Sequence, residues 1–279
     1  MALSFSVAYR KFRMMGCSFK DMFEGGEIQI WSGSAPTTAN AAATGTRLCT
    51  VTLSSGVRTP ETVATALLAF SAGAAGNTCT NITMESGTTD EILGATCTWA
   101  TSDGQLGDDV AAQINKFTQR LAKVWAYSDG AGNVTIYMAP GHGNSQNTAA
   151  MAVTVVGGTL ACAINGASAD QMGVGAGGST AGVDSANGLT WAAQVNGVIS
   201  KTGVWSGTAD ATGTAGYWRL VGVNNATDAS ALDSSPYYYP RIQGTCGLSG
   251  ADMNMDSLTF TSGNTYTIDT FEITEPSDE

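Results

Sequence analysis

The pattern of hydrophobic and polar positions predicts a chain of many short strands with one long helix. Between Leu106 and Trp125 the large apolar residues recur at spacings of four, four, three, four and three. They are Leu106, Val110, Ile114, Phe117, Leu121 and Val124. Such spacing puts them on one face of a helix. We therefore expect this face to be buried against the strands that surround it in the sequence.

Two further helices are predicted from residues that typically begin or end a helix. The stretch TPETVATALLAF looks like a helix start, with Thr59 as N-cap, Pro60 at the first helical position and Glu61 in the first turn. Residues 1–24 are expected to form a short helix, because their apolar residues fall loosely on one stripe before the Gly25-Gly26 pair.

Alternating large residues predict strands at 27–32 and 47–53. Further strands are expected at 78–84, 95–101, 133–138, 151–156 and 159–164. If 78–84 and 95–101 pair around a turn near Thr88, Cys79 lies directly opposite Cys97. Residues 166–188 form a low-complexity linker rich in glycine. From 189 onward, strand follows strand, with turn signals at the spacing of a β-sandwich.

Charge limits the classes of partner. The 279 residues carry a net charge of −11, so binding to nucleic acid is not expected. No run of about 18 apolar residues is present, so no membrane helix is expected. Four of the twelve basic residues lie in the first twenty positions, namely Arg10, Lys11, Arg13 and Lys20. They form either an arm that docks on an acidic partner or a solvated helix face. The other end is acidic, with Glu272, Glu275, Asp278 and Glu279.

The residues that usually carry catalysis or bind metals do not form a convincing set. The six cysteines form no C-x-x-C pair, and the single histidine, His142, lies in a turn-rich loop. A zinc site and a histidine-activated nucleophile are therefore not expected. We expect six reduced thiols, several of them buried. The G-x-G-x-x-G spelling at 173–178 falls in the glycine-rich linker instead of between a strand and a helix.

Acidic residues are better explained by structure than by chemistry. Asp108 and Asp109 lie near the start of the predicted helix, where they oppose its dipole. With Asp103 nearby, a weak calcium site is the alternative, although no EF-hand-like run is present. Asp252 and Asp256 frame a predicted strand edge. We therefore expect no enzyme activity, no catalytic residue, no cofactor and no metal.

Three adjacent tyrosines, Tyr237, Tyr238 and Tyr239, lie between Pro236 and Pro240 in a long loop. Three neighbours in a loop cannot all face one core. At least one is expected to contact either its own sandwich or a neighbouring subunit, where aromatic residues are enriched.

Two ends of the chain resemble a family of tailed-bacteriophage virion proteins with a characteristic pattern. Its opening, I-x-I-Y/W-S-G-x-x-P-x-x-A-x-x-A-x-T-G-x-x-L, is matched by Ile28, Ile30, Trp31, Ser32, Gly33, Pro36, Ala39, Ala42, Thr44, Gly45 and Leu48. Its close is matched by Gly213, Thr214, Ala215, Tyr217, Trp218 and Arg219, by Ile242, Gln243, Gly244, Gly247, Ser249, Gly250, Ala251 and Asp252, and by Thr270, Phe271 and Ile273. A middle segment is similar to a small module of phage structural proteins, through Asn81-Ile82-Thr83, Ile92-Leu93-Gly94, Thr98-Trp99 and Ala111 to Asn115.

Members of that family are shorter and lack the middle module, so the resemblance implies a nested architecture. The expected fold is mainly β, an Ig-like or jelly-roll-like antiparallel β-sandwich with an inserted small α+β domain. The expected parts are an N-terminal arm (1–24), a discontinuous sandwich (25–58 and 189–279) and the inserted domain with its linker (59–182).

The resemblance implies a non-enzymatic structural protein of the virion, assembled in the cytoplasm of the bacterial host. Its partners would be copies of itself and other virion proteins. The expected role is a head-surface decoration or cement protein that clamps neighbouring subunits of the major capsid protein. A neck or tail component and a host-adhesion or carbohydrate-binding module remain as alternatives. Candidate interface residues are Phe5, Arg10, Lys11, Phe12, Arg13, Phe19, Lys20, Tyr237, Tyr238 and Tyr239.

Overall fold

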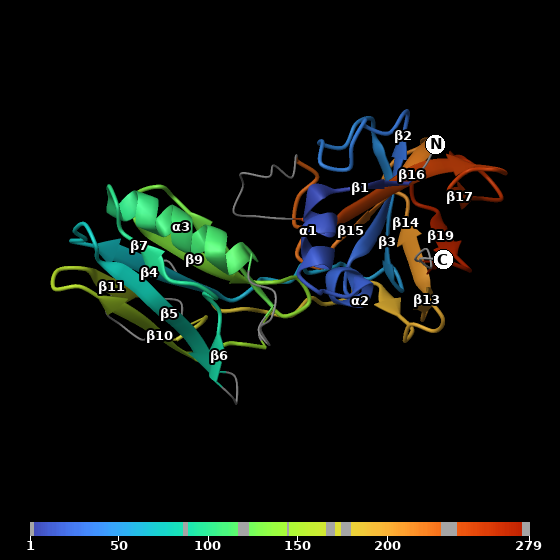
Figure 1. Cartoon of the computed structure of the whole chain (residues 1–279). Coiled ribbons are helices and arrows are strands. Elements are labelled where there is room, and N and C mark those ends of the chain that lie inside the picture. The colour runs from blue at the N-terminus through green and yellow to red at the C-terminus, as the bar shows by residue number, and fades with distance from the viewer. Residues whose placement is uncertain are drawn as a thin grey trace. The chain divides into compact units, whose positions relative to one another are not determined.

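The computed structural model describes residues 3–85, 89–116, 123–143, 145–165, 171–173, 180–229 and 239–274. The protein is mainly β and contains several antiparallel sheets (Figure 1). It forms two compact units. The first unit comprises residues 1–61 and 185–279, and the second comprises residues 62–184.

The first unit contains two short helices and two sheets. Its elements are β1 (Ser4–Phe5), α1 (Val7–Met14), α2 (Phe19–Phe23), β2 (Glu27–Ser32), β3 (Arg47–Leu53), β12 (Thr190–Trp191), β13 (Val198–Thr202), β14 (Trp205–Thr208), β15 (Gly213–Val221), β16 (Arg241–Gly247), β17 (Met253–Asn254), β18 (Thr259–Phe260), β19 (Thr265–Ile268) and β20 (Glu272–Thr274). The larger sheet has the order β1-β16-β15-β2-β3-β14-β19, with β17 added to β16 and β18 added to β15. The smaller sheet has the order β12-β13-β20.

The two sheets of the first unit meet through aromatic rings. Trp191 of β12 lies edge-on to Trp205 of β14 at 4.7 Å between ring centroids. Phe271, just before β20, lies edge-on to Trp218 of β15 at 5.6 Å. The three tryptophans are at most 2% exposed. Edge-to-face pairs of this kind add about 0.5–1.5 kcal/mol each beyond the area that they bury. This cluster therefore forms the centre of the first unit's core.

Residues 3–24, the segment expected as an N-terminal arm, pack within this unit. β1 pairs with β16, with Ser4 opposite Gln243. The side chain of Ser6 caps α1 by accepting from the Tyr9 amide at 3.1 Å. Ser18 and Asp21 form a capping box at the start of α2. The apolar stripe of this segment has a partner within its own unit, the core beneath the large sheet.

The second unit has two sheets and the long helix. Its elements are β4 (Thr65–Ser71), β5 (Thr78–Glu85), β6 (Thr89–Glu91), β7 (Cys97–Thr98), α3 (Asp103–Lys116), β8 (Val124–Ser128), β9 (Asn133–Met138), β10 (Ala150–Val156) and β11 (Ala161–Ile164). One sheet has the order β10-β5-β6, with β7 also on β5, and the other has the order β11-β4-β9-β8.

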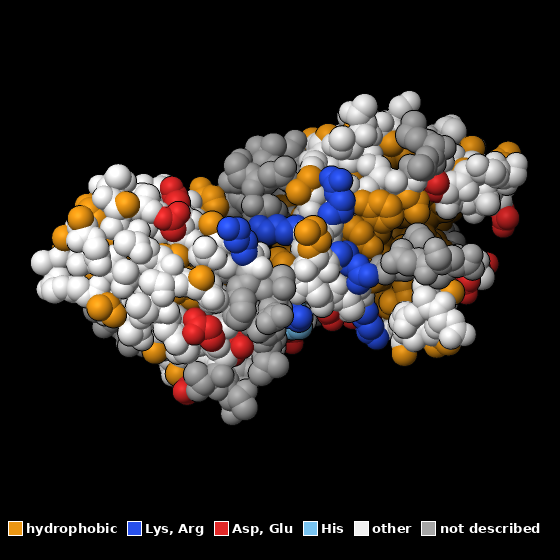
Figure 2. Space-filling view, in the orientation of Figure 1, with side chains coloured by type: hydrophobic (Ala, Val, Ile, Leu, Met, Phe, Trp, Pro, Cys, Tyr) orange, Lys and Arg blue, Asp and Glu red, His pale blue; other side chains and the backbone are white. Residues whose placement is uncertain are grey.

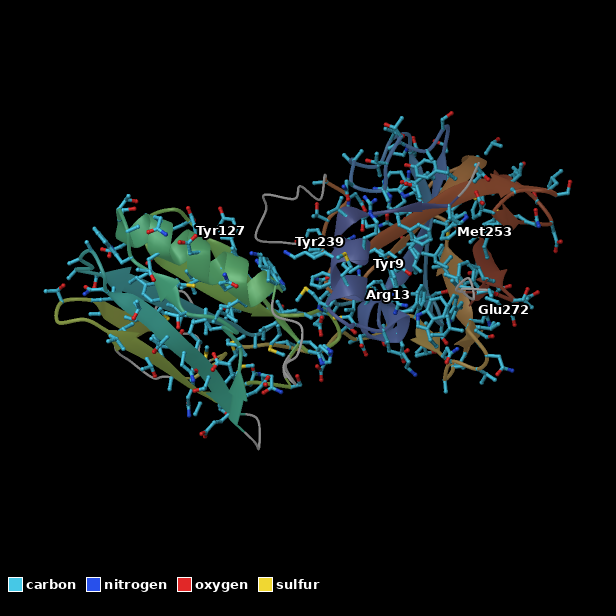
Figure 3. The ribbon with its side chains drawn as sticks, in the orientation of Figure 1. Tyr9, Arg13, Tyr127, Tyr239, Met253 and Glu272 are labelled. Atoms are coloured by element: carbon cyan, nitrogen blue, oxygen red, sulfur yellow. The ribbon has the colours of Figure 1, made fainter. Side chains whose placement is uncertain are left out.

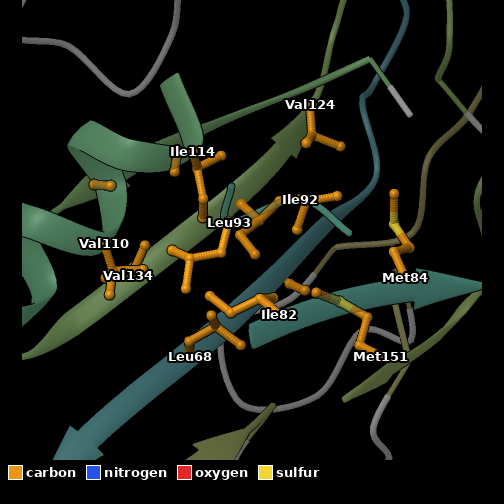
Figure 4. Packing of buried hydrophobic residues seen from close by; sticks show 14 of the residues in the cluster. Leu68, Ile82, Met84, Ile92, Leu93, Val110, Ile114, Val124, Val134 and Met151 are labelled. Atoms are coloured by element: carbon orange, nitrogen blue, oxygen red, sulfur yellow. The ribbon is translucent and has the colours of Figure 1, made fainter. Parts of the chain in front are cut away.

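The predicted long helix is confirmed as α3, where its apolar face is buried, but Val124, which was expected on the same face, lies in strand β8. Leu106, Val110 and Ile114 of α3 are 0% exposed and belong to the core of the second unit. Figure 4 shows Val110 and Ile114 within this core. Phe117 and Leu121 lie outside the described residues. Asn115 ties the helix to β8, because its side chain donates to the Ala126 carbonyl at 2.8 Å and accepts from the Ala126 amide at 3.0 Å.

The helix predicted from TPETVATALLAF is wrong. Its second half is β4, which lies between β11 and β9. Ala66, Leu68 and Phe70 alternate with less buried residues, so the stretch follows a strand period. Thr59 pairs with Ala186 in an isolated bridge instead of capping a helix, and Pro60 lies between this bridge and the one that joins Thr62 to Val183. Pairing with β11 and β9, and burial of the face that carries Ala66, Leu68 and Phe70, override the local signal.

The predicted pairing of the two cysteines is confirmed. Cys79 of β5 lies opposite Cys97 of β7, and both are buried free thiols. The expected turn near Thr88 lies outside the described residues. β5 is shared, because its first residues pair with β7 and its last residues pair with β6.

Candidate interaction surface

The candidate interface residues of the N-terminal segment fall into two groups. Phe12 is 0% exposed and Phe19 is 5% exposed. The Phe19 ring lies 4.7 Å from the Phe23 ring and 5.0 Å from the Trp191 ring. Both phenylalanines are enclosed by the first unit, so in this fold they stabilise it rather than present a surface. Phe5 is 37% exposed and stacks on Tyr9 at 4.9 Å.

The basic residues of the same segment remain partly accessible. Figure 2 shows Lys and Arg side chains gathered over the region of α1 and α2. Arg10 is exposed, and Lys11 and Arg13 are half-buried. Lys20 donates to the Trp191 carbonyl at 2.9 Å and lies 3.7 Å from Glu24, with 45% of its side chain exposed. Its charge is therefore anchored at the surface rather than free to move.

A groove of about 440 Å³ lies beside these bases. Its lining consists of Arg13, Ser18, Phe19, Lys20, Gln194, Gly197 and Ile199. Arg13 and Tyr9 both belong to α1, and Figure 3 labels them next to each other. Two cations on an apolar floor form a surface suited to an acidic partner.

The sequence alone did not predict that Gln194, Gly197 and Ile199 would line a groove together with residues of α1 and α2. Gln194, Gly197 and Ile199 belong to a hairpin whose turn residues, Asn196 and Gly197, have φ of 51° and 78°. Positive φ at both central residues is the type I′ geometry for which Asn-Gly is the strongest short-range signal. The turn could therefore have been found in the sequence, but not its neighbour.

The tyrosine run is only partly described. Tyr237 and Tyr238 lie outside the described residues. The Tyr239 ring lies 5.7 Å from the Arg241 guanidinium, which is a cation–π distance, and its carbonyl accepts from the Ser6 hydroxyl at 3.3 Å. Tyr239 thus contacts its own unit.

One face of the large sheet carries a layer of buried polar residues that the sequence reasoning missed. Arg219 and Arg241, on neighbouring strands, are both 0% exposed. Arg219 donates to Gln243 Oε1 at 2.7 Å, and Arg241 donates to Asn225 Oδ1 at 3.0 Å. The Arg219 Nε and Nη1 atoms and the Arg241 Nε atom have no hydrogen-bond partner within the described part of the chain.

Two buried like charges disfavour each other. Burial, and then the charge of Arg219, lower the pKa of Arg241 to about 10, against the opposing effect of Asp228. Burial also lowers the pKa of Arg219, and Asp228 again opposes it. Asp228 accepts from Gln29 Nε2 at 2.6 Å and from Arg47 Nη1 at 3.2 Å. Asp228 is therefore the carboxylate that offsets this layer.

A third arginine, Arg58, holds chain segments together. It donates to the carbonyls of Gly25, Gly222, Val223 and Asn225 at 2.8–2.9 Å. Its Nη1 lies 3.3 Å from Glu27 Oε2. Burial lowers the pKa of Arg58, while Glu27 raises it. The neighbouring pocket of about 250 Å³ includes Glu27, Arg47, Arg58 and Asp228. Its charges of both signs compensate each other, so it favours neither anions nor cations.

The residues weighed for chemistry have structural roles. Asp252 accepts from the Thr245 amide at 2.8 Å and from its hydroxyl at 2.9 Å. Asp103 accepts from the Gly73 amide at 3.0 Å and from Trp99 Nε1 at 2.9 Å. No cluster of three or more metal-ligating side chains occurs among the described residues.

The thiols of Cys49, Cys79 and Cys246 are poor nucleophiles. Burial raises the pKa of Cys79, Cys49 and Cys246 to about 12, so the reactive thiolate is scarce at neutral pH. His142 lies in a turn after β9. Residues 174–178 of the glycine-rich spelling lie outside the described residues. In the described part of the chain, no helix is both long and apolar enough to span a membrane.

The segments that carry the family-like pattern are brought together. β16, β15 and β2 are neighbours in the large sheet, with Trp218 opposite both Ile30 and Gly244. The loop after β2 is held by pattern residues from the other end of the chain. The Thr44 amide donates to Tyr217 Oη at 2.9 Å, and Tyr217 Oη donates to the Thr44 carbonyl at 2.8 Å.

Glycines of the pattern are required by close approaches. A Cβ at Gly45, where φ is +79°, would lie 2.2 Å from the Ser32 carbonyl oxygen. A Cβ at Gly244 would lie 2.7 Å from the Cβ of Asp252. Both distances are below any real contact, so each glycine allows two parts of the same pattern segment to approach closely.

No family model, characterised protein or solved structure matches this chain.

Proposed function

We propose that this chain is a non-enzymatic structural protein of a tailed-phage virion. In this proposal it decorates the outside of the head and clamps neighbouring subunits of the major capsid protein, with many copies cooperating. The first unit would be an Ig-like or jelly-roll-like sandwich, and the second unit would be a domain inserted into one of its loops.

One observation carries the proposal. The pattern segments lie far apart in the sequence, yet they occupy adjacent strands and bond to one another. Gln243 Nε2 donates to the Pro36 carbonyl at 2.6 Å and Gln243 Oε1 accepts from Arg219 at 2.7 Å, which links the opening of the pattern to its close. The residues that carry the resemblance therefore stabilise one another within the fold. This supports a building role over a catalytic one.

The connection between the units supports the insertion. Thr59 and Ala186 exchange backbone hydrogen bonds of 3.0 and 3.1 Å in the first unit. Thr62 and Val183 exchange hydrogen bonds of 2.9 and 2.7 Å in the second unit. The chain therefore leaves the first unit and returns to it at neighbouring points. Domains tolerate insertion where the chain ends lie close together.

The test is the copy number of this chain in purified particles, measured on a quantitative gel and by mass spectrometry. Hundreds of copies per particle support the head-surface role. Six or twelve copies overturn it in favour of a neck or tail component. If the chain is absent from particles and the isolated protein binds glycans, the structural proposal is wrong and the adhesion alternative is favoured.

A further inference from the structure

Strand β20 ends next to the groove beside α2. The last residue of β20, Thr274, pairs with Val198 of β13. Val198 stands between Gly197 and Ile199, and both of these residues line the groove. Because the pairing is antiparallel, β20 runs toward the Gly197 end of β13, and Thr274 is its residue nearest that end. The described part of β20 therefore ends beside the wall of the groove.

The last five residues of the chain have a charge opposite to that of the groove. Glu275, Asp278 and Glu279 provide three carboxylates, and no basic residue accompanies them. The groove presents Arg13 and Lys20. Five residues reach at most about 17 Å when extended. A groove of about 440 Å³ is near the lower end of the range of about 300–1,000 Å³ for ligand pockets, so it can hold part of this segment.

We propose that the groove is a binding site for an acidic segment and that its occupant is residues 275–279 of the same chain. A short tether gives an effective concentration in the millimolar range. A soluble acidic partner of similar chemistry would have to exceed that concentration to compete. The proposal does not depend on the virion role.

The contact is weak and sensitive to salt. Exposed ion pairs contribute about 0–1 kcal/mol each. Lys20 is already shared with Glu24 at 3.7 Å, so it offers the incoming carboxylates only part of its charge. Screening over about 10 Å at 0.1 M salt weakens the attraction further. A test must therefore detect a partly occupied contact directly and at low salt.

Carbodiimide cross-linking meets this requirement, because it joins a lysine amine to a carboxylate in contact with it and forms an amide. The full-length protein is treated at about 20 mM NaCl, where screening is weak, and digested, and the linked peptides are quantified by mass spectrometry. The expected product joins Lys20 to Asp278 or Glu279. A Lys20–Glu24 product is the internal positive control, since those groups already lie 3.7 Å apart.

Two variants with the same loss of charge separate the groove from general electrostatics. Arg13→Gln removes a charge that lines the groove, and the yield should fall about two- to fivefold, as expected for one exposed ion pair. Arg10→Gln removes an exposed charge from the same helix but outside the groove, and the yield should stay unchanged. Equal losses in the two variants would overturn the proposal.

An equal mixture of ¹⁵N-labelled and unlabelled protein identifies which copy supplies the segment. The expected cross-links contain only pairs of peptides with the same label. Mixed pairs would show that a second copy fills the groove and would overturn the proposal. The absence of any Lys20 link to residues 275–279, when the Lys20–Glu24 product is present, would also overturn it.

Discussion

Replacing Asp228 by Asn should destabilise the first unit while keeping the shape of the side chain. Asp228 accepts from Gln29 and Arg47, and it is the carboxylate that offsets the burial of Arg219 and Arg241. Asn keeps one oxygen acceptor but removes the charge. The two buried guanidinium groups then lose their compensation.

The size of the effect depends on the exposure of each partner. The Arg47 pair is 41% and 34% exposed, so it contributes about 0–1 kcal/mol. Breaking a fully buried charge pair costs about 3–5 kcal/mol. About a third of the Asp228 side chain is exposed, and water therefore screens part of the loss. We expect the free energy of unfolding of the first unit to fall by about 2 kcal/mol, within a range of about 1–3 kcal/mol.

Native-state hydrogen exchange in increasing urea measures this loss unit by unit. Peptides from β15 and β16 report on the first unit, and peptides from α3 serve as the internal reference. Asp210→Asn is the matched control, because Asp210 also pairs with Arg47, at 3.8 Å, but is 58% exposed. If Asp228→Asn changes the exchange of β15 and β16 no more than Asp210→Asn does, the reasoning about the buried layer is refuted.

Three further predictions concern the second unit and the connection. Ile114→Ala should lower the stability reported by α3 peptides by about 2–5 kcal/mol, whereas the exposed Lys116→Ala should change it by less than about 0.5 kcal/mol; equal effects would contradict the packing of α3. Burial raises the pKa of Cys79 to about 12 and that of Cys97 to about 11, so the folded state keeps protons that the unfolded state loses above its pKa of 9.0. Urea unfolding should show stability falling as the pH rises from about 9 toward about 11, by on the order of 1 kcal/mol per thiol at about pH 10. The double variant Cys79→Ala, Cys97→Ala should lose the part contributed by these two thiols and keep the part contributed by Cys49 and Cys246. Replacing residues 62–184 by a short glycine linker should leave a first unit that unfolds cooperatively by circular dichroism; an unfolded product would argue against the insertion.

The long helix could be predicted because its signal is local. Leu106, Val110 and Ile114 repeat at the helical period, and their burial requires only that some sheet lies beneath them. The strand β4 could not be predicted, because a proline next to a threonine indicates a helix start whichever residues come after it. Its strand state results from β9 and β11 on either side, which are distant in the sequence.

The interaction surface could be predicted only in part, for the same reason. The sequence indicated a basic segment with an apolar stripe. Nothing in it indicated that Phe12 and Phe19 would be enclosed by their own unit. Ile199 lines the groove, and the charge of Asp228 favours the charged forms of Arg219 and Arg241, only because the fold brings these distant segments together. Hydrophobic periodicity gives the faces of elements, but it does not identify which distant element will cover each face.

The order of strands in the large sheet determines when the first unit can fold during synthesis. β2 and β3 leave the ribosome early, but the neighbour that β2 needs on its other edge is β15. All of residues 62–184 must be made in between. At roughly 5–20 residues per second this takes about 6–25 s, which is long compared with hairpin formation in microseconds.

During that interval Ile28 and Ile30, which are at most 1% exposed in the finished fold, have no β15 to pair with. The second unit, made of one continuous stretch, can complete its own sheets meanwhile. The nascent chain thus contains a folded second unit while the first unit is still incompletely folded. Chaperone binding and premature association between nascent chains should therefore concentrate on residues 27–53.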